Sequence, residues 1–229
     1  MFKKARHKIR DERKIAKYAD HACEQAFDWK WEEKTYNRIA LINLLISQTD
    51  AKSYLEIGCQ DDNLFHSVPV MNKVGVDPAR GGNRRMTSDE FFETNTDSFN
   101  VIFIDGLHTC EQVRKDVVNA MKCLNPGGWI ALHDLLPGNW LEAHNPQITD
   151  GAWFGDVWKV GFELAQTEGL DFKIVQIDAG VGVFRIQNPE TKLIDMQDEM
   201  TNAQFDYFCK NQNILPITEW VDAQSWITS

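Results

Sequence analysis

The sequence contains no run of about 18 or more apolar residues, the length that a membrane-spanning helix needs, so we predict no transmembrane segment. No apolar stretch follows the basic residues near its start, as one would in a secretory signal, and we expect a cytoplasmic protein. The five cysteines are odd in number and include no Cys-x-x-Cys pair. This argues against a disulfide framework and against a thiolate zinc site.

Positive charge is scarce and unevenly distributed. The 24 Lys and Arg residues against 34 Asp and Glu give a formal net charge of -10, which argues against a nucleic-acid partner because phosphate contacts need a basic face. Residues 1–18 carry eight basic residues against two acidic ones, so this segment holds +6 and the remainder -16. We expect the basic arm to dock on its own acidic body or on a second subunit, which would give a homo-oligomer; an acidic partner or an anionic membrane surface is the alternative.

Two periodicities alternate along most of the chain. Short apolar runs indicate buried strands, and segments with apolar residues three and four apart indicate helices. Such alternation predicts an α/β fold with a parallel sheet covered on both faces, closed by an antiparallel hairpin at one edge. The predicted strands lie within 53–60, 73–78, 100–106, 129–134 and 172–187, the last holding two; the predicted helices lie at 36–47, from about 88, at 111–124, 155–166 and about 195–210.

Polar side chains stand at the ends of four predicted strands. Ligands of such sheets bind outside the carboxyl ends of the strands, so these side chains are candidates for one site. Each could instead have a local role, Asp105 as a helix cap, His108 as a surface residue and the last pair as a strand terminator. The candidates are Glu56 with Gly58, Asp77, Asp105 with His108, and His133 with Asp134.

The first two strand ends indicate an adenosine-bearing cofactor. A glycine after a strand lets a cofactor approach the backbone, and an acid ending the next strand can accept ribose hydroxyls. The Gly-x-Gly-x-x-Gly pattern of a dinucleotide site is missing after Gly58, and Asp61 and Asp62 would repel a pyrophosphate. A cationic cofactor without phosphates, S-adenosylmethionine, fits better.

Several segments together resemble the class I S-adenosylmethionine-dependent methyltransferases. They are YLEIGC, VGVDPARGG, MTSDEFF, VIFIDGLHTCEQVRKDVVNAMKCLNPGGWIALHD and GDVWKV, and the resemblance spans about 53–186. It is strongest to the branch with metal-dependent O-methyltransferases of sugars and small hydroxylated molecules. It implies a Rossmann-like, doubly wound, mostly parallel seven-stranded sheet. The expected domains are a helical arm at 1–50, a cofactor-binding domain at 51–188 and a helical extension at 189–229.

The resemblance also implies roles at matching positions. Glu56 and Gly58 form the first cofactor motif, Asp77 binds the ribose, and Ser88, with Met86 and Thr87 beside it, lies against the adenine. Asp105 is assigned to the cofactor, to a metal and to catalysis. The chain departs from the family by carrying Asp61 and Asp62 where another glycine is usual, so the loop is expected to differ or to need a partner to order it.

A metal site and a general base are implied at the later strand ends. Asp105 and Asp134 match acids that hold a divalent cation in the family, and His108 matches the base that takes the acceptor proton. His133 replaces a family acid, which gives a predicted metal set of Asp105, His133 and Asp134. Imidazole suits zinc better than magnesium or manganese, so the metal stays open. In the metal-free alternative, His133 lines the pocket wall and His108 acts alone.

We therefore predict a methyltransferase that acts on a hydroxyl group of a sugar, a glycan precursor or another small molecule. A metal-dependent hydrolase, a nicotinamide-dependent oxidoreductase and a non-catalytic binding protein are the alternatives. Aromatic residues downstream could close over the acceptor: Trp140 and Trp153 are lid candidates, whereas Trp158 is expected in the core. Arg80, Arg84 and Arg85 either bind an anionic acceptor or belong to a solvated loop.

Overall fold

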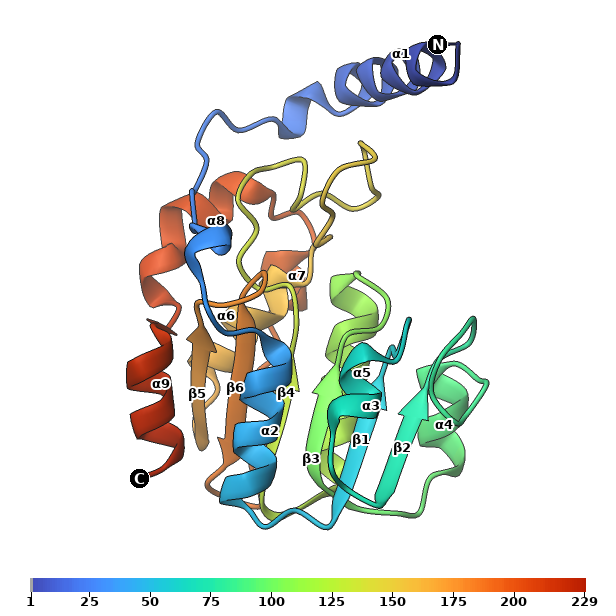
Figure 1. Ribbon diagram of the computed structural model, residues 1–229. Coiled ribbons are helices and arrows are strands. Elements are labelled where there is room, and N and C mark those ends of the chain that lie inside the picture. Colours follow the sequence, from blue (N-terminus) through green and yellow to red (C-terminus); the bar gives the residue numbers. More distant parts are fainter. Residues whose placement is uncertain (1) are drawn as a thin grey trace.

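The computed structural model of the protein describes residues 2–229, without the side chains of residues 2–6 and 8. What we predicted for Lys3, Lys4, Arg6 and Lys8 therefore lies outside the described residues. One seven-stranded sheet, in the order β2-β1-β3-β4-β6-β5-β7, forms the centre of the molecule (Figure 1). The strands are β1 Ser53–Ile57, β2 Asn72–Val76, β3 Phe99–Ile104, β4 Leu124–Leu132, β5 Leu170–Val175, β6 Val181–Ile186 and β7 Ile217–Thr218.

The sheet is mostly parallel, as predicted. Strands β2, β1, β3 and β4 pair in parallel, whereas β6 runs antiparallel to both β4 and β5. The β5–β6 hairpin lies at one side of the sheet, where the two-residue strand β7 pairs with β5. The fold class predicted from the sequence is thus confirmed. The helices are α1 Phe2–Lys17, α2 Arg38–Gln48, α3 Asn63–Ser67, α4 Ser88–Thr94, α5 Cys110–Lys122, α6 Trp158–Gln166, α7 Gln197–Met200, α8 Phe205–Asn211 and α9 Trp220–Ile227.

Helices cover both faces of the sheet (Figure 1). Neighbouring residues of one strand point to opposite faces, and in β1 Tyr54 packs into one apolar cluster while Leu55 packs into the other. The first cluster includes residues of α2 and α9, and the second includes residues of α5, α6 and α8. Trp158, expected in the core, is 1% exposed.

Local signals account for the starts of three helices. Asn37 caps α2 by accepting from the backbone N–H of Ile39, and Thr109 caps α5 by accepting from that of Gln112. Thr87 and Glu90 form a reciprocal capping box at α4, at the place where a helix was predicted to begin. Two of these caps fix the first turns of α4 and α5, the helices that follow β2 and β3.

The predicted helix at 195–210 is wrong in its continuity, because the chain forms two short helices, α7 and α8, with a break between them. The break lets Met200 and Phe205 both enter the core, at 3% exposure each. At the other end of the chain, α1 extends beyond the carboxyl ends of the strands, above the β4–α6 segment (Figure 1). In the described part of the chain, no helix has both the length and the apolar content to cross a membrane.

Candidate active site

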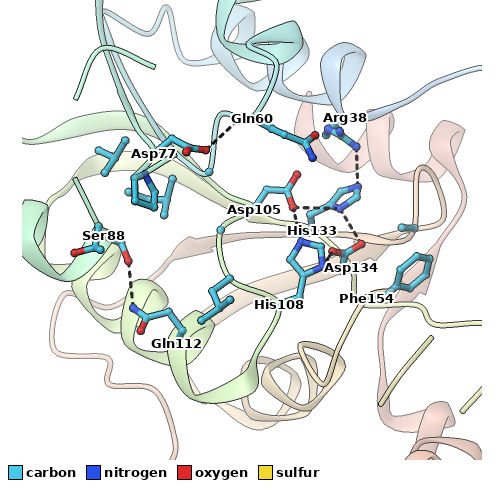
Figure 2. Close-up of a pocket in the computed structure, with 18 of the residues that line it drawn as sticks. Arg38, Gln60, Asp77, Ser88, Asp105, His108, Gln112, His133, Asp134 and Phe154 are labelled. Atoms are coloured by element: carbon cyan, nitrogen blue, oxygen red, sulfur yellow. Dashed lines mark hydrogen bonds and ion pairs between the residues drawn. The ribbon is translucent and has the colours of Figure 1, made fainter. Parts of the chain in front are cut away.

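A pocket of about 700 Å³ opens at the carboxyl ends of the first four strands (Figure 2). Every strand-end candidate except Glu56 lines it, and Ser88 lines it as well. The parallel register brings these ends together, as expected. The lining comprises Arg38, Ile57, Gly58, Gln60, Val76, Asp77, Pro78, Thr87, Ser88, Asp89, Asp105, Gly106, Leu107, His108, Gln112, His133, Asp134, Trp153, Phe154, Asp178 and Ala179.

Gly58 and Asp77 shape one end of the pocket. Gly58 has φ +84, and a Cβ there would overlap the backbone carbonyl of Asp105, so only glycine fits this close approach of two strand ends. Asp77 accepts four backbone N–H groups, those of Cys59, Gln60, Ala79 and Arg80, at 2.8–3.1 Å. Burial opposes its charge, but these donors lower the pKa of Asp77. Asp77 is therefore an ionised acid at the pocket surface.

Glu56 lies beneath this end and does not line the pocket. It is 2% exposed and accepts a hydrogen bond of 2.6 Å from the Tyr54 hydroxyl. Burial raises the pKa of Glu56 to about 8, so its neutral form is the stable one near pH 7. Contact of its side chain with a cofactor would need an intervening group or a movement, whereas the adjacent backbone reaches the pocket through Ile57 and Gly58.

The loop after β1 holds Asp62 where a further glycine was expected. Asp62 has φ +61, which lies in the left-handed region that glycine adopts most easily and aspartate tolerates. Its Oδ1 accepts from the backbone N–H of Gly82 at 2.6 Å, and exposed Asp61 pairs with Arg80 at 3.3 Å. The two acids thus tie this loop to the loop after β2.

Ser88 lies beside a glutamine that we did not single out from the sequence. The Gln112 Nε2 atom donates to Ser88 Oγ at 3.1 Å, and it lies 3.0 Å from Asp89 Oδ1 and 3.1 Å from Asp116 Oδ1. Asp116 is fully buried, its Oδ2 has no partner among the described residues, and burial raises its pKa to about 6. Asp116 could have been noticed in the sequence, because it stands next to Val117 on the apolar stripe of α5.

Asp105, His108 and Asp134 meet at the centre of the pocket (Figure 2). His108 Nδ1 lies 3.0 Å from Asp134 Oδ2 and 3.0 Å from the carbonyl oxygen of Trp153. Both partners only accept, so Nδ1 carries the hydrogen and the lone pair of neutral His108 is on Nε2. Nε2 lies 3.6 Å from Asp105 Oδ1. Burial alone would lower the pKa of His108, but Asp105 and Asp134 raise it.

The same three residues offer ligand atoms within 4.8 Å of one another. This set differs from the predicted metal set, since it contains His108 and not His133. His133 lies beside the same two acids: its Nδ1 lies 2.9 Å from Asp134 Oδ1 and 3.6 Å from Asp105 Oδ1, and its Nε2 lies 3.0 Å from Arg38 Nη1. Two carboxylates and one imidazole form a donor set that a divalent transition metal accepts.

Arg38 and Asp178 are pocket residues that the sequence reasoning missed. Arg38 donates to Asp178 Oδ2 from both its backbone nitrogen and Nη1, at 3.1 and 3.0 Å. Arg38 Nη1 also lies 3.0 Å from His133 Nε2. Burial disfavours charge on His133, but Asp105, Asp134 and Asp178 surround the ring and raise its pKa well above the ordinary value.

The segment between β4 and α6 forms one wall. The Trp153 ring stacks on His108 with centroids 5.3 Å apart, and Phe154 also lines the pocket. Trp140, the other predicted lid residue, packs edge-on against His144 instead and does not line the pocket.

The three arginines of the loop after β2 do not line the pocket either. Arg85 donates to the Asp77 carbonyl oxygen at 2.8 Å, and Arg80 pairs with Asp61. Arg84 donates to the neighbouring Asn83 carbonyl oxygen. These contacts fit the loop interpretation rather than the binding of an anionic acceptor.

Comparisons with known proteins agree with this geometry. Residues 63–135 match the model of a family described as a methyltransferase domain, whereas no curated protein matches the chain. A solved structure of a candidate O-methyltransferase from Klebsiella pneumoniae superposes with a TM-score of 0.50 at 15% identity, covering 78% of this chain and 90% of that one. Cofactor-bound Rv0187 from MTB gives 0.51 at 13% identity, covering 77% and 90%. At these identities the structural likeness shows the fold, and residues 63–135 are in addition similar to a methyltransferase domain.

Proposed function

We propose that this chain, a class I S-adenosylmethionine-dependent methyltransferase by its fold and its methyltransferase domain, transfers a methyl group from S-adenosylmethionine to a hydroxyl group of a small molecule. A sugar or glycan precursor is the acceptor that we favour. The observation that carries the proposal is the meeting of His108 with Asp105 and Asp134 in the same pocket that Gly58 and Asp77 line at its other end.

The cofactor would occupy the end of the pocket formed by Gly58, Asp77 and Ser88. Asp77 lies where the ribose hydroxyls would bind, and because its two oxygens already accept four backbone N–H groups, the hydroxyls would have to share or displace some of these donors. The carboxylates of Asp77, Asp105 and Asp134 suit the sulfonium and ammonium groups of S-adenosylmethionine. Glu56 would act through the backbone that it supports, and Asp105 would face the reacting end of the cofactor.

His108 would take the proton of the acceptor hydroxyl. Asp134 and the Trp153 carbonyl hold its Nδ1–H, so the lone pair on Nε2 is available to the acceptor. As the hydroxyl proton moves to Nε2, the oxygen forms a bond to the methyl carbon and the carbon–sulfur bond breaks, which leaves S-adenosylhomocysteine. The transfer itself needs only alignment of oxygen, carbon and sulfur.

A divalent cation fits the same place, because the ligand atoms of Asp105, His108 and Asp134 lie close enough together. A bound cation would supply Lewis acidity to the acceptor hydroxyl. The lone pair on His108 Nε2 can take a proton or bind a metal but cannot do both at once. The metal and the histidine-base mechanisms are therefore alternatives at this atom, and a metal-dependent hydrolase is the alternative function of the same three residues.

Calorimetric titration with S-adenosylhomocysteine, before and after chelation and with added Mg²⁺, Mn²⁺ or Zn²⁺, tests the proposal. We expect micromolar binding, followed by methyl transfer to hydroxylated acceptors. Methyl transfer by chelated protein would favour the base mechanism, and a metal requirement would favour chelation. Tight metal binding without any S-adenosylhomocysteine binding would contradict the proposal and favour a hydrolase.

The variant His108→Gln separates catalysis from binding. We expect its affinity for S-adenosylhomocysteine to stay within about twofold of wild type while kcat falls by about 10²-fold or more, the usual contribution of a general base. His66→Gln, at an exposed position of α3, is the matched control and should leave both unchanged. An unaltered kcat in His108→Gln would contradict the assigned role.

Three further features remain proposals. We propose that residues 51–188 act as the cofactor-binding domain, between the arm at 1–50 and the extension at 189–229. A homo-oligomer formed through the arm is proposed from its charge, and a cytoplasmic location from the sequence alone.

A further inference from the structure

The segment 153–156, between β4 and α6, holds His108 from several sides. The Trp153 ring stacks on the imidazole, and the Trp153 carbonyl oxygen lies 3.0 Å from Nδ1. Two residues further on, Gly155 lies against the main chain of His108. Asp156 Oδ1 then accepts from the backbone N–H of Cys110 at 2.8 Å. One short stretch of chain therefore contacts both the side chain and the main chain around His108.

Gly155 allows the segment to approach His108 this closely. Its φ is +61, in the left-handed region that favours glycine. A Cβ built on Gly155 would overlap the His108 carbonyl oxygen and lie 3.0 Å from the His108 Cβ. A larger residue would push the two stretches of backbone apart, and the Trp153 carbonyl would move with the segment.

Asp156 ties the segment to the start of α5. Cys110 is the first residue of α5, and the N–H groups in the first turn of a helix have no partner within the helix. Asp156 accepts one of them, and its negative charge is favourable at a helix N-terminus. Asn145 Nδ2 lies 3.3 Å from the same oxygen, and the ammonium of buried Lys159 lies 3.3 Å from Asp156 Oδ2. Both oxygens of Asp156 are therefore held.

The remaining backbone contacts of the segment stay within its own loop. The N–H groups of Phe154 and Gly155 both donate to the Glu142 carbonyl oxygen, at 2.9 and 3.0 Å. These bonds give the loop its shape but do not join it to α5. The carboxylate of Asp156 supplies that connection, two residues beyond His108.

We infer that Asp156 is a positioning residue for the methyl transfer. It holds the segment 153–156 against the start of α5, so that the Trp153 carbonyl keeps a hydrogen on His108 Nδ1 and leaves Nε2 to the acceptor. Asp156 acts only through these neighbours, because it does not line the pocket. The inference rests on the proposed function for the role of His108 as the base, whereas the contacts themselves do not depend on the acceptor.

Proton NMR after chelation of metal ions tests the inference without an acceptor. The hydrogen on His108 Nδ1 should give a low-field resonance that is absent from His108→Gln. In Asp156→Ala this hydrogen should exchange with solvent at least about tenfold faster. Asp156→Asn keeps an acceptor for the Cys110 N–H and should stay within about threefold of wild type. The hydrogen between His133 Nδ1 and Asp134 Oδ1 is the internal reference and should not change.

Calorimetry and kinetics separate positioning from a purely structural role. In Asp156→Ala the affinity for S-adenosylhomocysteine should stay within about twofold, while kcat for a methylated acceptor falls about tenfold or more with a smaller change in KM. Gly155→Ala should accelerate the His108 exchange in the same way. Asp198→Ala, at an exposed position of α7, is the matched control and should behave as wild type. Circular dichroism checks that each variant is folded.

Exchange at the wild-type rate in Asp156→Ala would overturn the inference, as would a wild-type spectrum without the His108 resonance. Loss of the His133 reference or of S-adenosylhomocysteine binding in Asp156→Ala would indicate general disruption of the site and would also overturn the positioning role. If the exchange rates change as expected but wild-type protein binds no S-adenosylhomocysteine, the proposed function fails while the positioning of His108 by Asp156 stands.

Discussion

Replacement of Asp116 by asparagine should stabilise the protein at neutral pH. The carboxyl group of Asp116 is fully buried, and burial raises its pKa from 3.8 to about 6. Below pH 3.8 both the folded and the unfolded chain carry a proton there, so folding carries no penalty for this group. As pH rises from 3.8 to 6 the unfolded chain loses the proton first, and the free energy of unfolding falls.

The size of the effect follows from the two pKa values. The penalty is about 3 kcal/mol at pH 7.5 and about 1 kcal/mol at pH 4.5. A neutral amide accepts a weaker hydrogen bond from Gln112 than a carboxylate does, which we take to cost about 1 kcal/mol. Asp116→Asn should therefore raise the free energy of unfolding by about 2 kcal/mol at pH 7.5 and leave it nearly unchanged at pH 4.5.

Urea unfolding followed by tryptophan fluorescence at both pH values measures this difference. With a slope of about 2 kcal/mol per molar urea, the midpoint at pH 7.5 should rise by about 1 M. Asp97→Asn, at an exposed position, is the control and should change the free energy by less than about 0.5 kcal/mol at either pH. Destabilisation at pH 7.5, or an equal gain at both pH values, would refute the reasoning.

Three other perturbations probe the pocket and its wall. Gly58→Ala forces a Cβ against the Asp105 carbonyl at φ +84, so urea unfolding should show a loss of about 2 kcal/mol or more, and calorimetry should show loss of S-adenosylhomocysteine binding. Trp153→Ala removes the ring that stacks on His108 but keeps the carbonyl that holds it, so steady-state assays should show a higher KM for the acceptor with a smaller change in kcat. Burial lowers the pKa of His144, so this histidine can take up a proton more readily once the arm has undocked. Undocking should therefore become easier as pH falls below about 6.5. Trypsin cleavage within α1, normalised to cleavage of a free peptide, should be faster at pH 6 than at pH 8.

The strand ends could be predicted because they depend on local pattern and on one rule of sheet geometry. Asp77, Asp105 and Asp134 follow apolar runs that could only be buried strands, and parallel strands place their carboxyl ends at the same edge. Gly58 was recognisable because a close approach of backbones needs glycine.

The residues that were missed reach the pocket through contacts distant in sequence. Arg38 meets Asp178 across 140 positions, and the backbone of Trp153 meets His108 across 45. Neither contact has a periodic signature in the sequence. The exchange of His133 for His108 in the candidate metal set could not be predicted either, because it depends on how the two rings lie around Asp105 and Asp134.

The charge of the basic arm predicted that the arm docks on another surface, but it did not predict which residues the arm contacts. Its described side chains contact the chain's own β4–α6 segment: Arg10 and His7 pair with Asp150, and His21 Nδ1 lies 2.9 Å from His144 Nε2. Exposed ion pairs contribute only about 0–1 kcal/mol each, so the half-buried histidine pair must supply much of the docking. The same segment carries Trp153, whose carbonyl oxygen holds the imidazole of the proposed base. The arm is thus connected to the reacting centre through one loop, and a change in its docking would reach catalysis by moving that carbonyl.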